Sequence, residues 1–165
     1  MSHDGDDLAG AFRSAMRRLA STVTIITTCD GGVRHGMTAT AVTSLCADPP
    51  SLLVCVNQAT RLHAMLQSAG GFCVNVLHRD HVEQSQAFSG RMQGDERFAI
   101  GRWAVDDRGM PFLADAQANL FCYKKAAIPH GTHSIFIGEV ERVGVRDDIA
   151  PLLYQNAAYV SIASA

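Results

Sequence analysis

Apolar residues near the start of the chain recur at helical spacing. Between Leu8 and Leu19 they follow one another at intervals of three and four, which predicts a helix over about residues 7–20. The chain then changes to β-branched and apolar runs bounded by Gly, Pro and Asp, a pattern typical of strands. These runs predict strands over residues 22–29, 34–45, 51–56, 71–77, 117–124, 133–143 and 152–162. Short helices are predicted over 60–66 and 81–88, with an irregular loop over 89–111.

The order of these elements predicts the fold class. Strands outnumber helices and often follow one another directly, which favours an antiparallel sheet over β-α-β units. Six or seven strands in one domain suit a closed or nearly closed barrel, because closure removes exposed edges. We therefore expect one mainly β domain over residues 8–165, preceded by a disordered tail over residues 1–7.

Composition and charge narrow the class of protein. Of the 165 residues, 47% are hydrophobic and 18% are charged, values of a globular domain. The 14 Lys and Arg residues nearly balance the 16 Asp and Glu residues, and no basic cluster stands out, so no nucleic-acid partner is expected. No apolar run approaches the ~20 residues of a membrane span, so no membrane is expected. The first seven residues are polar and acidic, unlike a secretory signal.

The cysteines indicate a reducing compartment. There are five of them, an odd number, and no two are spaced as C-x-x-C. Most lie inside apolar runs, so we expect free, buried thiols rather than catalytic or redox thiols. Free thiols without a signal peptide favour a cytoplasmic location.

The segment 36–44 is rich in Thr and Ala and could border a flat ligand. Strand alternation puts Thr38 and Thr40 on one face and Ala39 and Ala41 on the other. Small side chains let a planar heteroaromatic ring approach the backbone, and hydroxyl groups offer donors along its edge. The alternative is a strand that simply packs beneath a neighbour.

Residues 57–61, Asn-Gln-Ala-Thr-Arg, lie between a buried strand and a predicted helix start, with Thr60 as the N-cap. Free N–H groups at a helix N-terminus favour an anion. Thr60 adds a hydroxyl donor, and Arg61 adds a guanidinium group suited to phosphate. The segment therefore suggests a phosphate site, and the alternative is plain helix capping beside a solvated arginine.

The segment 130–133, His-Gly-Thr-His, contains two histidines three positions apart. His133 opens a strand, on which positions i and i+3 point to opposite faces, and no Cys or carboxylate lies nearby at ligand spacing. We therefore predict no metal site. A histidine beside a glycine turn could face a cleft and contact a substrate, and the alternative is a surface-loop histidine.

Known catalytic motifs are missing from the sequence. We find no Ser-His-Asp pattern, no G-x-S-x-G, no P-loop and no G-x-G-x-x-G. A nicotinamide nucleotide, if used, is therefore not held in the Rossmann manner.

Several segments together resemble the flavin reductase-like family with the FMN-binding split-barrel fold. The likeness is greatest to the short reductase components of two-component flavin-dependent monooxygenases, and it runs from about Phe12 to Tyr159. Its most specific part is residues 37–44, followed by the Asp-Pro-Pro-Ser-Leu run at 48–52. The other segments that carry it are residues 12–16, 22–28, 55–57, 72–77, 96–98 and 131–133.

This resemblance implies a fold and an activity. The implied fold is a six-stranded antiparallel Greek-key split barrel with a few flanking short helices, in a homodimer with flavin near the subunit interface. The implied enzyme is an NAD(P)H:flavin oxidoreductase that passes hydride from NADH or NADPH to FMN or FAD and supplies a separate monooxygenase. Alternatives are a reductase of a corrinoid or ferric chelate through bound flavin, and a non-catalytic flavin-binding protein.

The resemblance also implies site residues. The strand over 38–44 would border the isoalloxazine ring, Asn57 would lie along the ring or ribityl chain, and Thr60 and Arg61 would meet the phosphate. His133 matches the histidine of a Gly-Asp-His motif that meets the nicotinamide nucleotide, although the middle residue here is Thr132. We thus expect His133 as the catalytic residue, and as flavin-binding residues Met37, Thr38, Ala39, Thr40, Ser44, Asn57, Gln58, Thr60, Arg61, Phe88 and Arg91.

Overall fold

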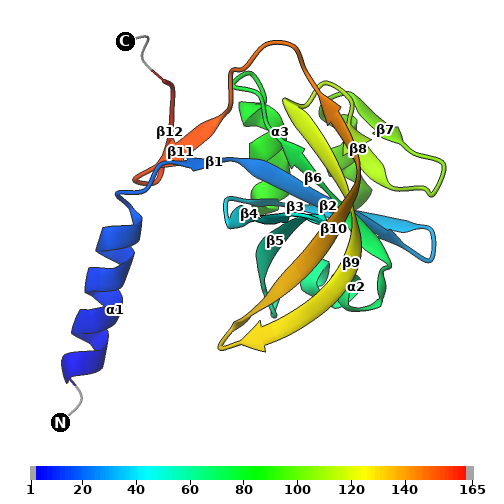
Figure 1. The fold of residues 1–165 in the computed structure, drawn as a ribbon. Coiled ribbons are helices and arrows are strands. Elements are labelled where there is room, and N and C mark those ends of the chain that lie inside the picture. Colours follow the sequence, from blue (N-terminus) through cyan, green and yellow to red (C-terminus); the bar gives the residue numbers. More distant parts are fainter. Residues whose placement is uncertain (1–2, 163–165) are drawn as a thin grey trace.

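The computed structural model describes residues 3–162, and only the backbone for residues 3–6 (Figure 1). Its helices are α1 (His3–Met16), α2 (Arg61–Ser68) and α3 (Val82–Gln86), with a π-helical turn (Ala87–Arg91) and a 3-10 helix (Gly94–Ala99). Its strands are β1 (Ser21–Thr22), β2 (Thr24–Asp30), β3 (Val33–Ala39), β4 (Val42–Ala47), β5 (Pro50–Asn57), β6 (Gly71–Val76), β7 (Trp103–Val105), β8 (Pro111–Leu113), β9 (Ala118–His130), β10 (His133–Val145), β11 (Leu153–Gln155) and β12 (Ala158–Val160).

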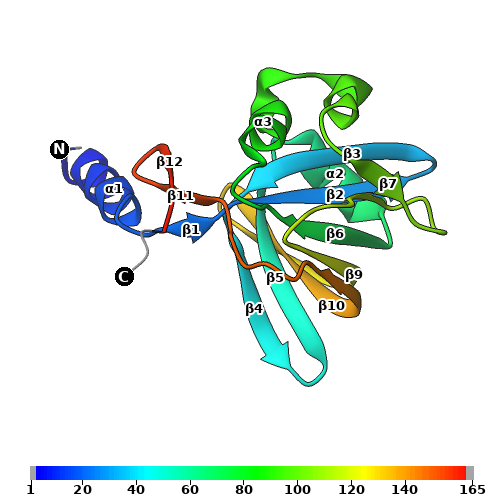
Figure 2. The same ribbon diagram turned by 90° about the horizontal axis from the view of Figure 1, so that it is seen from above.

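The main sheet has seven strands in the order β3-β2-β6-β9-β10-β5-β4, and every neighbouring pair is antiparallel. Its two edge strands, β3 and β4, are separated in the chain only by Thr40 and Ala41. The sheet therefore curls until its edges come together at this corner, which makes a split barrel (Figures 1 and 2). The mainly β, antiparallel prediction is confirmed, but the strand count is seven rather than six.

The extra strand arises at residues 40–41. Val42 N–H donates to Thr40 O at 3.0 Å, and Cys55 N–H donates to Ala41 O at 3.0 Å. This tight turn moves the chain from pairing with β2 to pairing with β5, so the predicted strand over 34–45 is two strands. The predicted alternation of faces across 36–44 is therefore wrong beyond Ala39.

Other boundaries also differ from the sequence prediction. Helix α1 begins at His3, so residues 3–7 are helical rather than a tail, and residues 1–2 lie outside the described part. The predicted loop over 89–111 contains the turn at 87–91, the helix at 94–99 and the β7–β8 pair. The predicted last strand is the β11–β12 hairpin, which joins β1 in a small sheet.

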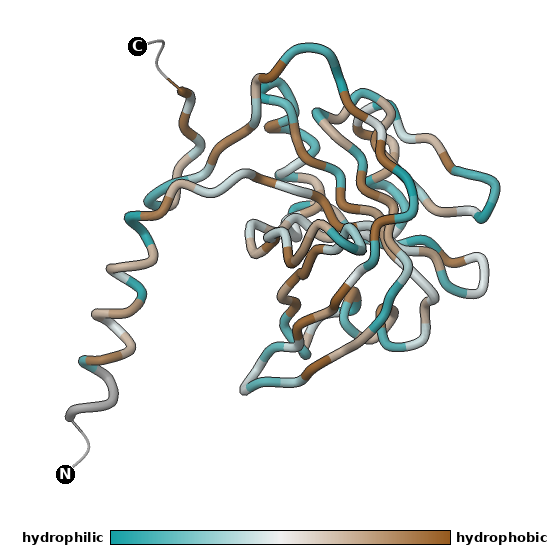
Figure 3. The backbone as a smooth tube through the Cα atoms, in the orientation of Figure 1, coloured by the Kyte–Doolittle hydropathy of each residue, from teal (hydrophilic) through white to brown (hydrophobic). Residues whose placement is uncertain are grey.

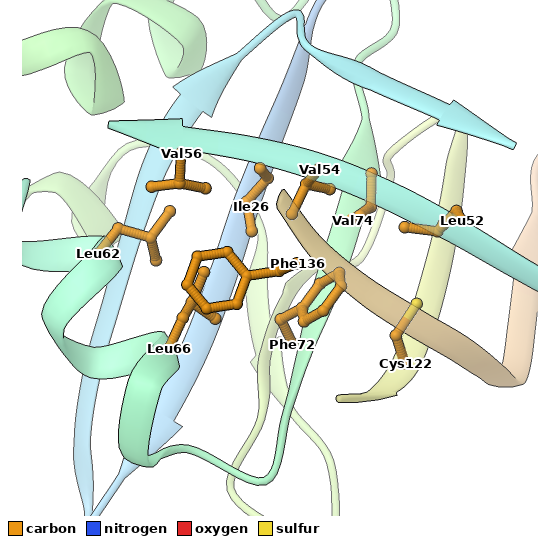
Figure 4. Close-up of a cluster of buried hydrophobic side chains, with 10 residues drawn as sticks. All are labelled: Ile26, Leu52, Val54, Val56, Leu62, Leu66, Phe72, Val74, Cys122 and Phe136. Carbon is orange, nitrogen blue, oxygen red and sulfur yellow. The ribbon is translucent and has the colours of Figure 1, made fainter. Parts of the chain in front are cut away.

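Strand β2 is buried on both faces, which explains its unbroken β-branched sequence. Ile26 points into a cluster inside the barrel, while Ile25 packs into a second cluster outside it. Figure 4 shows the inner cluster, in which Leu62 and Leu66 of α2 face Phe136 of β10. Helix α2 thus closes one end of the barrel. Burial of a leucine side chain such as Leu62 or Leu66 stabilises the fold by about 2 kcal/mol.

The outer cluster fixes the segment after β6 against β2 and β3. It includes Phe88, Phe98 and Leu113, and the Phe88 and Phe98 rings meet edge to face at 5.0 Å between centroids. Trp103 contacts both rings, with its centroid 4.9 Å from that of Phe88 in a tilted arrangement and 5.0 Å from that of Phe98 edge to face. This packing orders the irregular stretch after α3.

Helix α1 stands away from the barrel in both ribbon views, attached through the small sheet of β1, β11 and β12 (Figures 1 and 2). Hydrophobic positions recur along it in Figure 3, and four large apolar side chains of the helix and its C-terminal extension are exposed. No helix within the described residues is long and apolar enough to cross a membrane.

Candidate functional site

The end of β5 and the start of α2 form a tightly bonded loop. Asn57 Oδ1 accepts from Ala59 N–H at 2.9 Å, and Asn57 O accepts from the Thr60 hydroxyl at 2.8 Å. The Thr60 hydroxyl in turn accepts from His63 N–H at 3.2 Å, which confirms Thr60 as the N-cap. Because a cap satisfies only part of the first helical turn, the N–H groups of Arg61 and Leu62 stay available to an external acceptor.

The cap should contribute measurably to stability. We expect Thr60→Ala to lower the free energy of unfolding by about 1 kcal/mol, because His63 N–H loses its acceptor. Urea unfolding at neutral pH measures this, with Thr60→Ser as the matched control that keeps the hydroxyl. Equal stability of Thr60→Ala and the natural chain would show that the cap is not stabilising.

Three basic side chains gather beside this loop. His35 of β3 is only 9% exposed, and burial together with nearby Arg97 and Arg61 lowers its pKa to about 4. Burial, and then Arg61, also lowers the pKa of Arg97, which is 6% exposed. Arg61 therefore lies close enough to act on both of the other groups.

No carboxylate neutralises this cluster of His35, Arg61 and Arg97. Among the ion pairs formed within the described residues, none includes either guanidinium. Arg97 is instead held by backbone oxygens, with Nη1 donating to Gly36 O at 2.8 Å and Nε to Gly94 O at 3.0 Å. Partly desolvated positive charge without a counter-ion favours binding of an anion, and the open helix N-terminus of α2 adds to this effect.

The turn that carries His133 is fastened to the same loop. His133 lies opposite Asn57 in the β10–β5 ladder, after Gly131 at φ +55°. Gln58 N–H donates to Thr132 O at 2.9 Å, and Gln58 Nε2 donates to His133 O at 2.9 Å. The Thr132 hydroxyl and His133 Nδ1 are 2.9 Å apart. His133 is thus exposed, but its backbone and one ring nitrogen are held.

The far end of β3 borders a small cavity of about 270 Å³. Its floor is the Thr38–Thr40 segment, and Tyr154 and Tyr159 of the β11–β12 hairpin form a wall. The Tyr159 hydroxyl donates to Ser85 Oγ at 2.9 Å. The cavity is therefore lined by small polar groups and aromatic rings.

Strand β3 connects this cavity with the basic cluster. His35 and Ala39 share one face because they are four positions apart on a strand, a separation of about 13 Å. An elongated ligand with a flat part and an anionic end would match both features. The arrangement is suited to binding, since no side-chain pair in it forms a nucleophile with a base.

The structure separates the predicted flavin residues into several places. Asn57, Gln58, Thr60 and Arg61 lie together with His133, and Ala39 and Thr40 lie at the cavity. The remaining predicted residues, described next, are Met37, Thr38, Ser44, Phe88 and Arg91.

Two of these residues contact the segment that follows β6, and one of them, Thr38, also lines the cavity. The Phe88 ring is 1% exposed and packed against Phe98 and Gly36, and its predicted flavin contact stays a prediction. The Thr38 hydroxyl donates to Ser85 O at 2.7 Å, which ties β3 to α3. The sequence pattern did not show either contact, because both depend on a segment that follows β6.

The other three lie in different settings. Met37 packs against the inner cluster. Ser44 is exposed on β4 and lines a separate groove with Thr40. Arg91 is exposed, and its Nη1 donates to Gln86 Oε1 at 2.7 Å. Their flavin contacts stay predictions.

Sequence reasoning missed His35, Arg97 and the tyrosines at the cavity. Arg97 and His35 are 62 positions apart, so their approach depends on the fold. The sequence did contain a signal for His35. Strand alternation places it on the same face as Met37 and Ala39, two residues that were predicted to contact the flavin. No comparable local signal points to Tyr154.

Comparisons with known proteins identify the family of this chain. The family model described as "Flavin reductase like domain" matches residues 16–163. The reductase component of an FADH(2)-dependent resorcinol hydroxylase from Rhizobium sp. (strain MTP-10005) is 47% identical over 156 residues, covering 93% of this chain and 87% of that protein.

Two further relatives carry names that mention flavin and nicotinamide. An FMN reductase (NADH), RutF 1, of Methylorubrum extorquens is 42% identical over 151 residues, covering 92% of this chain and 75% of that protein. The solved structure of the NADH:FAD oxidoreductase SgcE6 of Streptomyces globisporus C-1027, in complex with NAD and FAD fragments, superposes with a TM-score of 0.88. Its identity is 26%, covering 97% of this chain and 95% of that one.

Proposed function

Since the chain belongs to the flavin reductase-like family, we propose that a flavin lies along β3, between the basic cluster of His35, Arg61 and Arg97 and the cavity at Thr38–Thr40, and that His133 meets a reduced nicotinamide. We call this proposed flavin site the β3 cleft. The chain is an NAD(P)H-dependent flavin reductase. The observation that carries the placement is the uncompensated basic cluster beside the helix start, in which His35 and Arg97 are buried and Arg61 is exposed. A phosphate is the anion that this donor set suits best.

Different residues of the β3 cleft bind different parts of the flavin. Arg61, Arg97 and the α2 N-terminus hold the phosphate, and Asn57 lies next along the ligand. Ala39 and Thr40 leave room for the flat ring, and Tyr154 limits it on the other side. The flavin, when bound, supplies the hydride-accepting chemistry, so the chain itself needs no dedicated acid or nucleophile.

His133 acts by orienting the nicotinamide. Its backbone is held by Gln58, and its Nδ1 contacts Thr132, which leaves Nε2 as the free ring nitrogen at the open side. One hydrogen bond from this nitrogen would hold the reduced nucleotide close to the ring, where rate depends on correct distance.

Replacing His133 should therefore affect the nicotinamide more than the flavin. We expect His133→Ala to raise the KM for NADH about five- to tenfold, the value of one hydrogen bond of about 1 to 1.4 kcal/mol. The dissociation constant of the flavin should stay within about twofold. Steady-state kinetics and flavin fluorescence measure the two effects.

The neighbouring histidine supplies the control. His130 lies opposite His133 across the turn and is also exposed, so His130→Ala should leave both constants unchanged. A KM and kcat of His133→Ala equal to those of the natural chain would remove His133 from the site.

We further propose that the enzyme supplies reduced flavin to a separate monooxygenase and works as a homodimer. The name of the Rhizobium relative, a reductase component of a hydroxylase, supports the first part. Exposed apolar surface on α1 supports the second. Five free cysteines and the need for reduced nicotinamide favour a cytoplasmic location.

The test is oxidation of NADH and NADPH at 340 nm by the purified chain with added FMN or FAD. Turnover that depends on added flavin is the expected result. The rates then show whether the enzyme prefers NADH or NADPH, and FMN or FAD. Turnover only with a corrinoid or ferric chelate would assign another acceptor. Flavin binding without any turnover would assign a non-catalytic flavin-binding protein.

A further inference from the structure

His63, in the first turn of α2, joins this helix to the strand that carries His133. Its Nε2 lies 2.9 Å from the Oγ of Ser134, the residue that follows His133 on β10. The His63 ring also meets the Phe136 ring edge to face, with 5.4 Å between the centroids. Because Phe136 belongs to the inner cluster of Figure 4, the imidazole has a fixed place at the end of the barrel.

The neighbouring amides fix the direction of the hydrogen bond between His63 and Ser134. Gln67 Nε2 lies 3.3 Å from His63 Nε2, and Gln58 Nε2 donates to Ser134 Oγ at a longer 3.4 Å. An amide nitrogen can only donate, so His63 Nε2 and Ser134 Oγ both act as acceptors in these contacts. The proton between them therefore comes from the Ser134 hydroxyl. His63 accepts it at Nε2, in the tautomer that has its own proton on Nδ1.

Ser134 needs this acceptor because it is buried. Only 2% of the residue is exposed, and a buried hydroxyl donor without an acceptor costs free energy that a small shift of the backbone can relieve. Such a shift would begin at the residue next to His133. The Gln58 side chain would transmit it, since its amide donates both to Ser134 Oγ and to His133 O.

The turn that carries His133 lies at the end of a two-stranded hairpin. The ladder between β6 and β9 ends at Tyr123, and the ladder between β5 and β10 ends at His133. At the tip, residues 130–133, the strands β9 and β10 pair with each other, and a hairpin of two strands is only marginally stable by itself. Hydrogen bonds from outside the hairpin, such as those of Gln58 and His63, thus decide how firmly the turn is held.

We propose that His63 is a positioning residue for the nicotinamide. Through Ser134 it holds the turn in the geometry in which His133 receives the reduced nucleotide, and it acts without touching the nucleotide itself. This role rests on the proposed function of His133. The support that His63 gives to the turn does not rest on it.

Steady-state kinetics with NADH test the role of His63. We expect His63→Ala to raise the KM for NADH about three- to fivefold, with kcat and the dissociation constant of the flavin within about twofold. His63→Gln should restore the KM, because the glutamine side-chain oxygen can accept from the Ser134 hydroxyl. Ser134→Ala should give the same increase as His63→Ala. The double variant should give no further increase, since both substitutions remove one contact.

A His133→Ala background shows whether the effect passes through His133. In that background, His63→Ala should leave the KM for NADH unchanged, whereas a merely structural substitution would add its own effect. Ser68→Ala is the matched control in α2, because the Ser68 hydroxyl bonds to Asp30 of β2 rather than to β10. It should leave the KM at the natural value. An increase that persists in the His133→Ala background overturns the positioning role, and so does a natural KM for His63→Ala.

Amide hydrogen exchange of the ligand-free chain tests the support of the turn without the proposed function. Gln58 N–H, which donates to Thr132 O, is the reporter. It should exchange about three- to tenfold faster in His63→Ala than in the natural chain, and at the natural rate in Ser68→Ala. Unchanged exchange in His63→Ala would contradict the proposal. Faster exchange together with a natural KM for His133→Ala would confirm that His63 holds the turn and would count against the proposed function of His133 instead.

Discussion

Arg61→Gln should weaken the binding of FMN about ten- to hundredfold. A charge-assisted hydrogen bond to phosphate is worth about 1.5–3 kcal/mol, and Arg61 is the exposed member of the basic cluster. Arg61 forms no hydrogen bond or ion pair with other side chains among the described residues, so its loss should leave the fold intact. Titration of flavin fluorescence gives the dissociation constants.

Riboflavin provides a control for this prediction, because it has the same ring without the phosphate. Its affinity should be equal for Arg61→Gln and the natural chain. Arg13→Gln, on α1, removes a positive charge outside the cleft and should leave FMN binding unchanged. If Arg61→Gln weakened FMN and riboflavin equally, the phosphate would lie elsewhere.

Acid should destabilise the protein through His35. The pKa of this buried imidazole is about 4, whereas in the unfolded chain it is about 6.5. Between these values the unfolded state binds the proton and the native state does not, so stability falls as pH falls. The loss is about 1.4 kcal/mol per pH unit and reaches about 3 kcal/mol near pH 4. Above about pH 6.5 His35 contributes no pH dependence.

The measurement compares urea unfolding at pH 7.5 and pH 5.0 for the natural chain and for His35→Gln. We expect the natural chain to lose about 2 kcal/mol more than the variant over this interval. His130→Gln removes an exposed histidine and should behave like the natural chain. Equal losses for His35→Gln and the natural chain would show that the imidazole is not held neutral.

The sequence predicted the fold well where a pattern repeats locally. The β-branched run of β2 is visible without a structure, because it reflects the two faces that the strand buries. The continuous apolar run of β5 predicted a strand at the right place, but it also predicted burial on both faces, whereas burial along β5 alternates. The corner at Thr40 and Ala41 was missed, because Thr and Ala residues continue smoothly through it. Only the change of partner from β2 to β5 shows that one strand ends there.

In the candidate site, too, the sequence predicted what neighbouring residues form and missed what depends on contacts between distant segments. Residues 57–61 are adjacent in the chain, so capping chemistry identified the loop and its Thr60 cap. Arg97 reaches the site because Phe88, Phe98 and Trp103 pack together and carry the 3-10 helix to β3. A prediction from one sequence has no means of locating such a contact, since it depends on packing between distant segments.

Gln58 has a consequence for how the two substrates influence each other. Its backbone and side chain both donate to the turn of His133, while the next residues form the loop at the phosphate end of the cleft. A ligand that orders one of these segments reduces the entropy still to be lost at the other. Flavin and nicotinamide should therefore each increase the affinity of the enzyme for the other, and thermodynamic reciprocity requires the two factors to be equal.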